Sequence, residues 1–199
     1  MTGEILMVVP NLFEGGGGIA RIARSTAAVL QGYARERDAQ LTVMALGDSG
    51  EKRDERVLGP DARLLGFSGD RVALAREVLR RGRAGSHLVT VFCHVNLSSL
   101  GLLYRRSGRR GTYVVVAHGI DVWRRLPFHR RLALRHAREV WPVSEFTGKA
   151  LLRHGVDRAR IRVIHNCLDP EWPLDGASQP SSEPPFVLAV ARLCQIRRR

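Results

Sequence analysis

Glycines, histidines and small polar residues follow a series of short apolar runs in this chain, each at the point where a run ends. Run 5–9 leads to four glycines, and runs 88–93 and 112–117 lead directly to His94 and His118. In an open parallel sheet the carboxyl ends of the strands form one rim, where ligands bind. The residues placed at this predicted rim are Gly15, Gly16, Gly17, Gly18, Arg21, His94, Asn96, Ser98, His118, Gly119, Asp121, Ser144, Glu145, Asn166 and Asp169. Their convergence, rather than any single residue, predicts a binding site.

The stretch 4–30 predicts a strand, a glycine loop and a helix that form the first part of this rim. The run 5–9 is typical of a strand buried on both faces of a parallel sheet. Gly15–Gly18 lets the backbone take left-handed angles and approach a ligand closely, and apolar residues recur at helical spacing from residue 19 to residue 30. The N–H groups at that helix start suit phosphate or sugar oxygens. Arg21 opposes the helix dipole there, so the cation indicates either a bound anion, a nearby carboxylate or a solvated surface position.

Other phosphate-binding and catalytic patterns fit poorly. Gly15-x-Gly17-x-x-Ala20 resembles the dinucleotide fingerprint, but that motif needs its first glycine directly after the strand. No acidic residue closes the second strand either, since Asp48 lies past its end. Ser144 lacks the flanking glycines of a nucleophile elbow, and neither a Walker loop nor a metal-ligand spacing occurs.

The elements that must position the rim alternate along the chain. Strands are predicted at 5–9, 40–46, 62–67, 88–93, 112–117, 140–143 and 161–165. Helices are predicted at 19–30, 71–81, 96–104, 127–138 and from Ser144 to Gly155. The helix 71–81 would be capped by Asp70 and would bury Val72, Ala75, Val78 and Leu79. This alternation predicts an α/β fold with a Rossmann-like open parallel sheet flanked by helices, and Pro142 favours an edge position for its strand.

The hydrophobic content, charge and cysteines of the chain indicate its partners and its location in the cell. The chain is 44% hydrophobic and carries a net charge of +13, with 13 basic and 11 acidic side chains in residues 1–100 but 19 and 8 in residues 101–199. That asymmetry indicates a surface for phosphates, on lipid or nucleic acid, or a compositional bias toward arginine. Three widely spaced cysteines suit a reducing cytosol, and no run approaches a membrane span. We therefore expect a cytoplasmic protein.

The last part of the chain changes in composition. Residues 1–174 are predicted to form the Rossmann-like domain, and 175–185 is a linker rich in Pro and Ser. Beyond it, 186–190 is again an apolar strand. Because a lone strand has no partner of its own, residues 186–199 are expected to begin a truncated second domain. The alternative is that this strand folds back onto the edge of the first sheet.

Four segments together resemble the GT-B glycosyltransferases of family 4. These are the loop Gly15–Arg21, the turn Ala117–Asp121, the start Val143–Glu145 with Gly155 ten residues on, and the run Ile161–Asp169. The final run 187–193 resembles the first strand of that family's second domain. The resemblance covers essentially the whole chain in matching order.

The resemblance implies two Rossmann-like domains facing a cleft, the first holding mainly the acceptor and the second the nucleotide sugar. Transfer would retain the anomeric configuration and need no metal or cofactor. His118 would lie near the reacting sugar as the catalytic residue. Donor or acceptor would be bound by Gly16, Gly17, Gly18, Arg21, Asn96, Asp121, Ser144, Glu145 and Arg192. The family pattern is altered at Cys167 and after Arg192, and the donor half is missing, so we expect this chain alone not to transfer sugar.

The partners expected from this resemblance are a nucleotide-sugar donor and a glycan or lipid-linked acceptor, in bacterial envelope or exopolysaccharide synthesis. The basic segment 124–138, with Leu126, Phe128, Leu132 and Leu134 interspersed, either lies on an anionic membrane or forms a solvated face.

Two alternatives to a glycosyltransferase function remain. One is a basic α/β module that binds nucleic acid, although few aromatic residues are available for stacking, so no nucleic acid is expected. The other is an inactive fragment.

Overall fold

The computed structural model describes residues 3–84, 87–107 and 112–167. The described residues form one compact unit that ends at Cys167. The strands are β1 (Glu4–Val9), β2 (Gln40–Ala45), β3 (Arg63–Gly66), β4 (His87–Phe92), β5 (Val114–Ala117) and β6 (Glu139–Pro142). The helices are α1 (Gly18–Glu36), α2 (Arg71–Ala84), α3 (Ser98–Ser107), α4 (Ile120–Trp123), α5 (Phe128–His136) and α6 (Glu145–Arg153), with the short 3₁₀ turns η1 (Val95–Leu97) and η2 (Arg158–Arg160).

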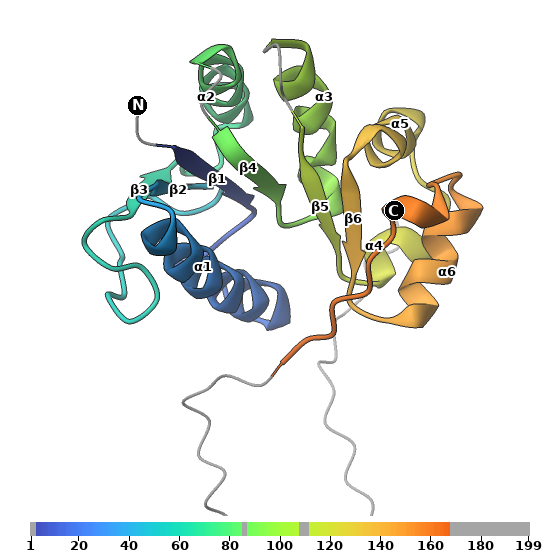
Figure 1. Ribbon diagram of the computed structural model, residues 1–199, viewed down its shortest axis with the longest axis horizontal. Helices are drawn as coiled ribbons and strands as arrows, with labels where there is room; N and C mark the ends of the chain where they lie inside the picture. Colours follow the sequence, from blue (N-terminus) through green and yellow to red (C-terminus); the bar gives the residue numbers. More distant parts are fainter. Residues whose placement is uncertain (1–2, 85–86, 108–111, 168–199) are drawn as a thin grey trace, which may run out of the picture. The chain divides into compact units, whose positions relative to one another are not determined.

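The six strands form a single parallel sheet in the order β3-β2-β1-β4-β5-β6. Helices α2, α3 and α5 lie side by side on one face, and α1 lies on the other (Figure 1). The predicted α/β class, Rossmann-like arrangement and edge position of β6 are confirmed. All strands point the same way, so their carboxyl ends form one rim, from which the loops to the following helices leave.

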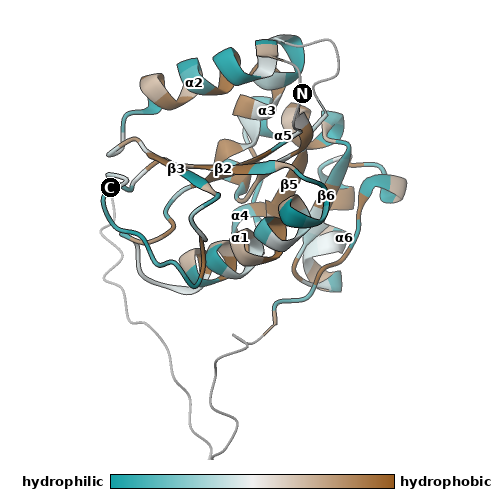
Figure 2. Ribbon diagram, turned by 60° about the vertical axis from the view of Figure 1, so that its left-hand side comes forward, coloured by the Kyte–Doolittle hydropathy of each residue, from teal (hydrophilic) through white to brown (hydrophobic). Residues whose placement is uncertain are grey.

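Alternating side chains of β1 enter two different cores. Leu6 and Val8 belong to the core beneath α2, α3 and α5, while Ile5, Met7 and Val9 pack on the α1 side. All five are fully buried. In Figure 2 the central strands are accordingly among the most hydrophobic segments drawn. Burial on both faces explains why this strand reads as a continuous apolar run rather than an alternating one.

One predicted strand differs from the structure, and one short helix was not predicted. Residues 161–165 are not a strand; a single bridge joins Val140 to Ile161, and the N–H groups of Arg162 and Ile164 donate to β6 carbonyls at 3.1 and 3.0 Å. The run follows the sheet edge without forming a full ladder. The short helix α4 was not predicted, because its four residues are too few to show a helical period.

The buried face of α2 also differs from the prediction. Val78 is buried as predicted, but Val72 is 60% exposed, and Leu74 and Arg81 point inward instead. Arg81 is buried because its guanidinium pairs with the carboxylates of Glu4 and Glu77. The stem of an arginine packs like an apolar side chain once its head is paired, which hydropathy alone does not reveal. The cap predicted at Asp70 is confirmed, since its carboxylate accepts from the N–H groups of residues 72 and 73 at 2.9 Å.

The linker 175–185, the segment 186–199 and Arg192 lie outside the described residues. The basic segment 124–138 is described and contains α5. Its apolar residues do not share one face, since Leu126 and Leu134 are buried whereas Phe128 is 69% exposed. The mixed orientation is that of a helix packed on a core with a charged outer surface.

Candidate functional site at the carboxyl rim

The described candidate residues follow the ends of four neighbouring strands. Gly16–Gly18 and Arg21 come after β1, Asn96 after β4, His118 and Asp121 after β5, and Ser144 and Glu145 after β6. Because β1, β4, β5 and β6 are adjacent in the sheet, the glycine loop and His118 lie at the same rim, separated by the end of β4. The parallel strands thus place the described candidates along one edge of the sheet.

The loop after β1 is held by a buried carboxylate. Asp48, which follows β2 and is 1% exposed, accepts from the N–H groups of Leu12 and Phe13 at 3.0 and 2.8 Å. The side chain of Arg24 on α1 donates to the carbonyl of Leu12 at 2.8 Å. These bonds come from two other elements, so they fix the loop that leads into the glycines. Such charge-assisted bonds are stronger than bonds between neutral groups.

The glycines in this loop have different roles. Gly17 is the N-cap of α1 with φ +101°, an angle that residues with a Cβ rarely adopt. A Cβ placed on Gly16 or Gly18 would meet no atom within 4 Å, so these two glycines leave open space above the backbone. The cap of α1 has no side-chain hydrogen bond, and its first turn has no acidic residue. This helix start therefore suits an anionic or polyhydroxyl ligand.

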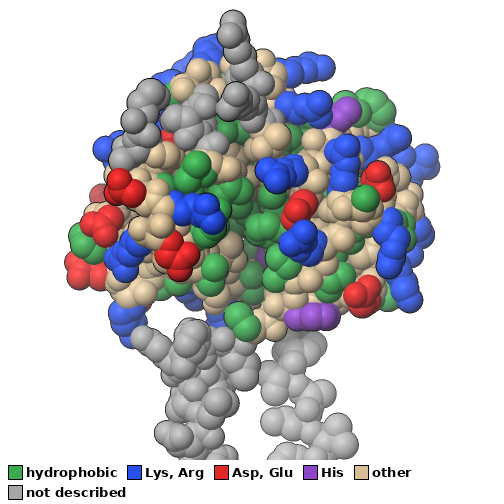
Figure 3. Space-filling model, in the orientation of Figure 1, with side chains coloured by type: hydrophobic (Ala, Val, Ile, Leu, Met, Phe, Trp, Pro, Cys, Tyr) green, Lys and Arg blue, Asp and Glu red, His purple; other side chains and the backbone are tan. Residues whose placement is uncertain are grey.

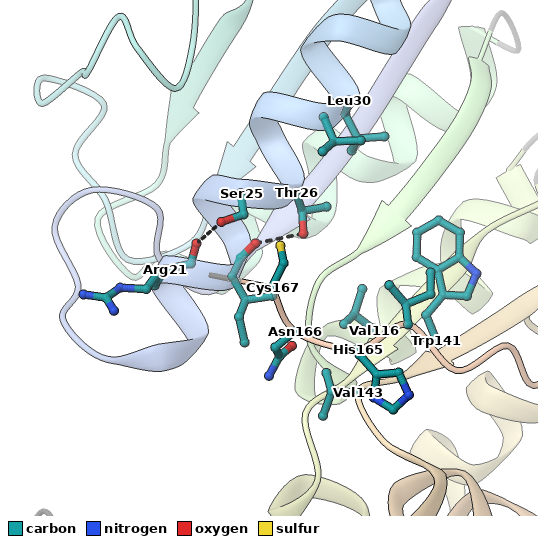
Figure 4. A pocket seen from close by; sticks show the side chains of 13 residues that line it. Arg21, Ser25, Thr26, Leu30, Val116, Trp141, Val143, His165, Asn166 and Cys167 are labelled. Carbon is teal, nitrogen blue, oxygen red and sulfur yellow. Dashed lines mark hydrogen bonds between the residues drawn. The ribbon is translucent and has the colours of Figure 1, made fainter. Parts of the chain in front are cut away.

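A hollow of about 310 Å³ opens between α1 and the ends of β5 and β6. Its walls are apolar, from Leu30, Val116, Trp141 and Val143, and Arg21, His165 and Asn166 also line it. Figure 4 shows the backbone of Arg21 at one end, with its guanidinium directed away from the other labelled side chains. The hollow therefore gives the rim an apolar wall on the α1 side of the sheet.

His118 is held against the end of β4. Its Nε2 lies 2.8 Å from the carbonyl oxygen of Cys93. A carbonyl only accepts, so Nε2 carries a proton and donates. Nδ1 of His118 and Oδ1 of Asp121 are both buried and have no hydrogen-bond partner in the described part of the chain. The other carboxylate oxygen of Asp121 accepts from the N–H of His118 at 3.3 Å. Two buried polar atoms that could still form hydrogen bonds thus belong to residues only three positions apart in the sequence.

A second histidine lies beside the first. The rings of His94 and His118 have their centroids 5.6 Å apart. His94 is 7% exposed, and its Nδ1 accepts from the N–H of Asn96 at 3.0 Å, which places the proton of the neutral ring on Nε2. Burial lowers the pKa of His94. The carboxylate of Asp121 raises this pKa, whereas the nearby His118 and Arg130 lower it further. His94 is therefore neutral at pH 7 and shapes the wall behind His118.

The remaining predicted residues are less closely grouped. The hydroxyl of Ser144 accepts from the N–H of Thr147 at 3.2 Å and so caps α6, as predicted. Asn96 and Glu145 are exposed, and among the described residues neither side chain forms a hydrogen bond with His118. Arg192 lies outside the described residues. The structure thus brings His118 and Asp121 together, with His94 beside them, and places the other candidates along the rim.

Asp48 was missed as a structural element of the site. The available signal was its position three residues after the end of β2, since closeness to a strand end also selected the other rim residues. In the sequence it is separated by 34 to 36 residues from the N–H groups that it binds, so only the pairing of β1 with β2 reveals the contact. Among residues 3–84, 87–107 and 112–167, no group of three His, Cys, Asp or Glu side chains is arranged to hold a metal ion.

Comparison with known proteins agrees with this geometry. The sequence matches the family model of Glycosyltransferase Family 4 over residues 16–172. No curated protein sequence matches. Solved structures share the fold. The apo lipopolysaccharide outer core galactosyltransferase WaaB is 13% identical with a TM-score of 0.59, over 83% of this chain and 46% of that one.

Two further structures are similar at low identity. Anabaena Alr3699/HepE in complex with UDP-glucose is 15% identical with a TM-score of 0.57, over 83% of this chain and 44% of that one. UDP-N-acetylglucosamine 2-epimerase from Rickettsia bellii is 11% identical with a TM-score of 0.54, over 82% and 44%. The chain thus spans less than half the length of these proteins, and at such identities the likeness concerns the fold. A transferase and an epimerase share it, so the family match carries the distinction.

Proposed function

Because the chain belongs to glycosyltransferase family 4, we propose that it takes part in transferring a sugar from a nucleotide-sugar donor to a glycan or lipid-linked acceptor. In this reaction the bond from the anomeric carbon to the nucleotide's phosphate oxygen breaks, and a bond to the acceptor oxygen forms. The acceptor hydroxyl gives up its proton to the departing phosphate, and the anomeric configuration is retained. The observation that carries the proposal is the convergence of the glycine loop and the His118–Asp121 pair at one rim of a family 4 domain.

The residues of the rim would have different roles in ligand binding and catalysis. The open backbone at Gly16 and Gly18, with the uncapped start of α1, would receive phosphate or hydroxyl oxygens. His118 would lie next to the reacting sugar, where an imidazole N–H directed at developing charge stabilises it. In the structure Nε2 is bonded to Cys93 and Nδ1 is buried, so we propose that the ring turns when ligand binds. Asn96, Ser144 and Glu145 would bound the acceptor.

Ligand-linked thermal stability tests the assignment. We expect the melting temperature of the 199-residue chain to rise with members of a panel of nucleotide sugars and glycans, because a ligand that binds only the folded state stabilises it. DNA and RNA should give no shift at physiological salt. A shift with nucleic acid and none with any sugar ligand would contradict the proposal and favour the basic nucleic-acid-binding module.

We also propose that this chain by itself does not complete the transfer. Support comes from its coverage of only 46% of the galactosyltransferase WaaB and 44% of HepE, two solved structures that it resembles. A mass-spectrometric assay with nucleotide sugars and the acceptors that stabilise the chain should show no product; product formation would contradict this. The remaining expectations, on metal independence, a cytoplasmic location and a role in envelope or exopolysaccharide synthesis, are part of the same proposal. A chelator should leave ligand binding unchanged.

A further inference from the structure

One surface of the domain combines exposed apolar side chains with unpaired cations. We define the α6 face as Trp123, Phe146, Lys149, Leu152 and Arg153. Phe146 is 60% exposed, Trp123 50% and Leu152 38%, and the two aromatic rings meet edge to face with centroids 5.5 Å apart. Residues 146, 149, 152 and 153 recur at helical spacing, so they share one side of α6. Large apolar side chains grouped on a surface mark an interaction site.

The charge around this face is positive. In the described part of the chain, neither Lys149 nor Arg153 nor Arg158 forms an ion pair. Lys149 and Arg158 border a hollow of about 490 Å³ with Arg162, whose guanidinium reaches Glu139 at 3.5 Å; Glu145 also lines it. Figure 3 shows Lys and Arg side chains gathered along the side formed by α5 and α6. Cations outnumber acidic groups here, so the face complements a negatively charged partner.

We propose that the α6 face is a docking surface for an anionic lipid bilayer. Aromatic side chains favour the interface between headgroups and acyl chains, and each nearby Lys or Arg adds attraction to anionic lipid. A nucleic acid would share the charge complementarity but would leave Leu152 and the edge-to-face aromatic pair without a matching partner. Among the described residues, none of the helices has the length and hydropathy of a membrane span.

This surface differs from the basic segment 124–138 that the sequence suggested for membrane contact. Leu126 and Leu134 of that segment are buried in the core and are not available to lipid. On the α6 face the apolar groups are exposed. The ring of Trp123 also lies over Gly119, where an added Cβ would meet it at 3.0 Å, so the docking surface adjoins the loop that carries His118. Bilayer binding itself does not depend on sugar transfer.

Vesicle flotation of the 199-residue chain tests the proposal. We expect binding to phosphatidylcholine vesicles that contain phosphatidylglycerol, weak binding to phosphatidylcholine alone, and release at high salt. Phe146→Ser should lower the partition coefficient about ten-fold, because one apolar ring no longer enters the interface. Lys149→Gln, Arg153→Gln and Arg158→Gln should each lower it about five-fold.

Matched controls lie on α2, which is on the far side of the domain from α6 (Figure 1). Val72→Ser removes an apolar side chain that is 60% exposed, and Arg71→Gln with Arg76→Gln and Arg83→Gln removes three exposed cations. These variants should bind like the unaltered chain. Equal losses in the α2 and α6 variants would show a non-specific charge effect and overturn the proposal, as would the absence of binding to anionic vesicles.

A second measurement does not depend on comparing variants of altered charge. Brominated phosphatidylglycerol should quench the fluorescence of Trp123, and Trp123→Phe should remove the quenching although Trp141 and Trp172 remain. Quenching that persists in Trp123→Phe would overturn the assignment. So would light scattering that showed the face buried in a dimer broken by Phe146→Ser, or binding to DNA with none to anionic vesicles.

Discussion

The carboxylate of Asp48 accepts a 2.8 Å hydrogen bond from the N–H of Phe13, 35 residues away in the sequence. With the bond to Leu12 it ties the loop after β1 to the end of β2. An amide in place of the carboxylate has one acceptor oxygen and turns a donor group toward buried N–H groups. We therefore expect Asp48→Asn to lower the free energy of unfolding by about 2 kcal/mol, measured by urea denaturation followed by circular dichroism.

Asp61→Asn is the matched control. Asp61 pairs with Arg35 at 3.5 Å on the surface, where its side chain is 68% exposed. Exposed pairs contribute little, so this variant should stay within about 0.5 kcal/mol of the unaltered chain. If both variants were equally stable, the Asp48 carboxylate would not hold the loop as described.

Alanine at two neighbouring glycines should separate strain from ligand contact. Gly17→Ala places a Cβ at φ +101° and should cost roughly 1–3 kcal/mol of unfolding free energy. Gly16→Ala meets no atom within 4 Å and should leave stability within about 0.5 kcal/mol, or raise it slightly by restricting the unfolded chain. Under the proposed function the Gly16 variant should nevertheless lose stabilisation by sugar ligands. Thermal melts with and without ligand measure both effects.

Hydrophobic pattern was sufficient to predict the six strands that form the sheet. The run 5–9 is apolar at every position because alternate residues enter different cores, and that identified a buried parallel strand. Caps at Asp70 and Ser144 were predictable because they depend on residues only two or three positions away. The rim followed from the sheet, since parallel strands bring their carboxyl ends together wherever they are in the sequence.

Contacts set by pairing between distant segments were not predictable in this way. The inward orientation of Arg81 depends on Glu4 from β1, and the role of Asp48 depends on the loop after β1. The run 161–165 has strand-like composition, but it meets β6 through a single bridge. That His118 would donate to Cys93, and that Nδ1 would be left buried, needed coordinates, because a sequence does not reveal side-chain direction.

The buried histidine at the rim should make stability fall in mild acid. Burial lowers the pKa of His94 below its usual 6.5, so the folded state stays neutral where the unfolded state takes up a proton. Its contribution is therefore fully present above about pH 6.5 and is lost as the pH falls, by at most about 1.4 kcal/mol per pH unit. His94→Asn keeps an acceptor for the N–H of Asn96 but cannot titrate. Urea titrations at pH 7 and pH 5 should show a smaller loss in the variant than in the unaltered chain.

Glu77 should contribute stability over a lower pH range. Its hydrogen bond with Arg80 and then its bond with Arg81 lower its pKa from 4.5 to about 2. The contribution is therefore present above about pH 4.5 and is lost as the pH falls toward 2. Because Arg80 is largely exposed and the buried Arg81 keeps its pair with Glu4, we expect Glu77→Gln to cost only about 1 kcal/mol at pH 7. The difference in unfolding free energy between the variant and the unaltered chain should shrink in acid. A difference that stayed constant from pH 7 to pH 3 would contradict the assigned pKa.

Two substitutions at His118 should separate its structural bond from its proposed role with the sugar. Glutamine can place an N–H near the position of Nε2 and keep the bond to the carbonyl of Cys93, so His118→Gln should remain within about 0.5 kcal/mol of the unaltered stability. His118→Ala leaves that carbonyl without its donor and should cost about 1–2 kcal/mol. If the imidazole contacts the sugar, both variants lose most of the ligand-induced rise in melting temperature. A His118→Gln variant that kept the full rise would show that the ring does not reach the ligand, and the proposed turn of His118 away from Cys93 would be wrong.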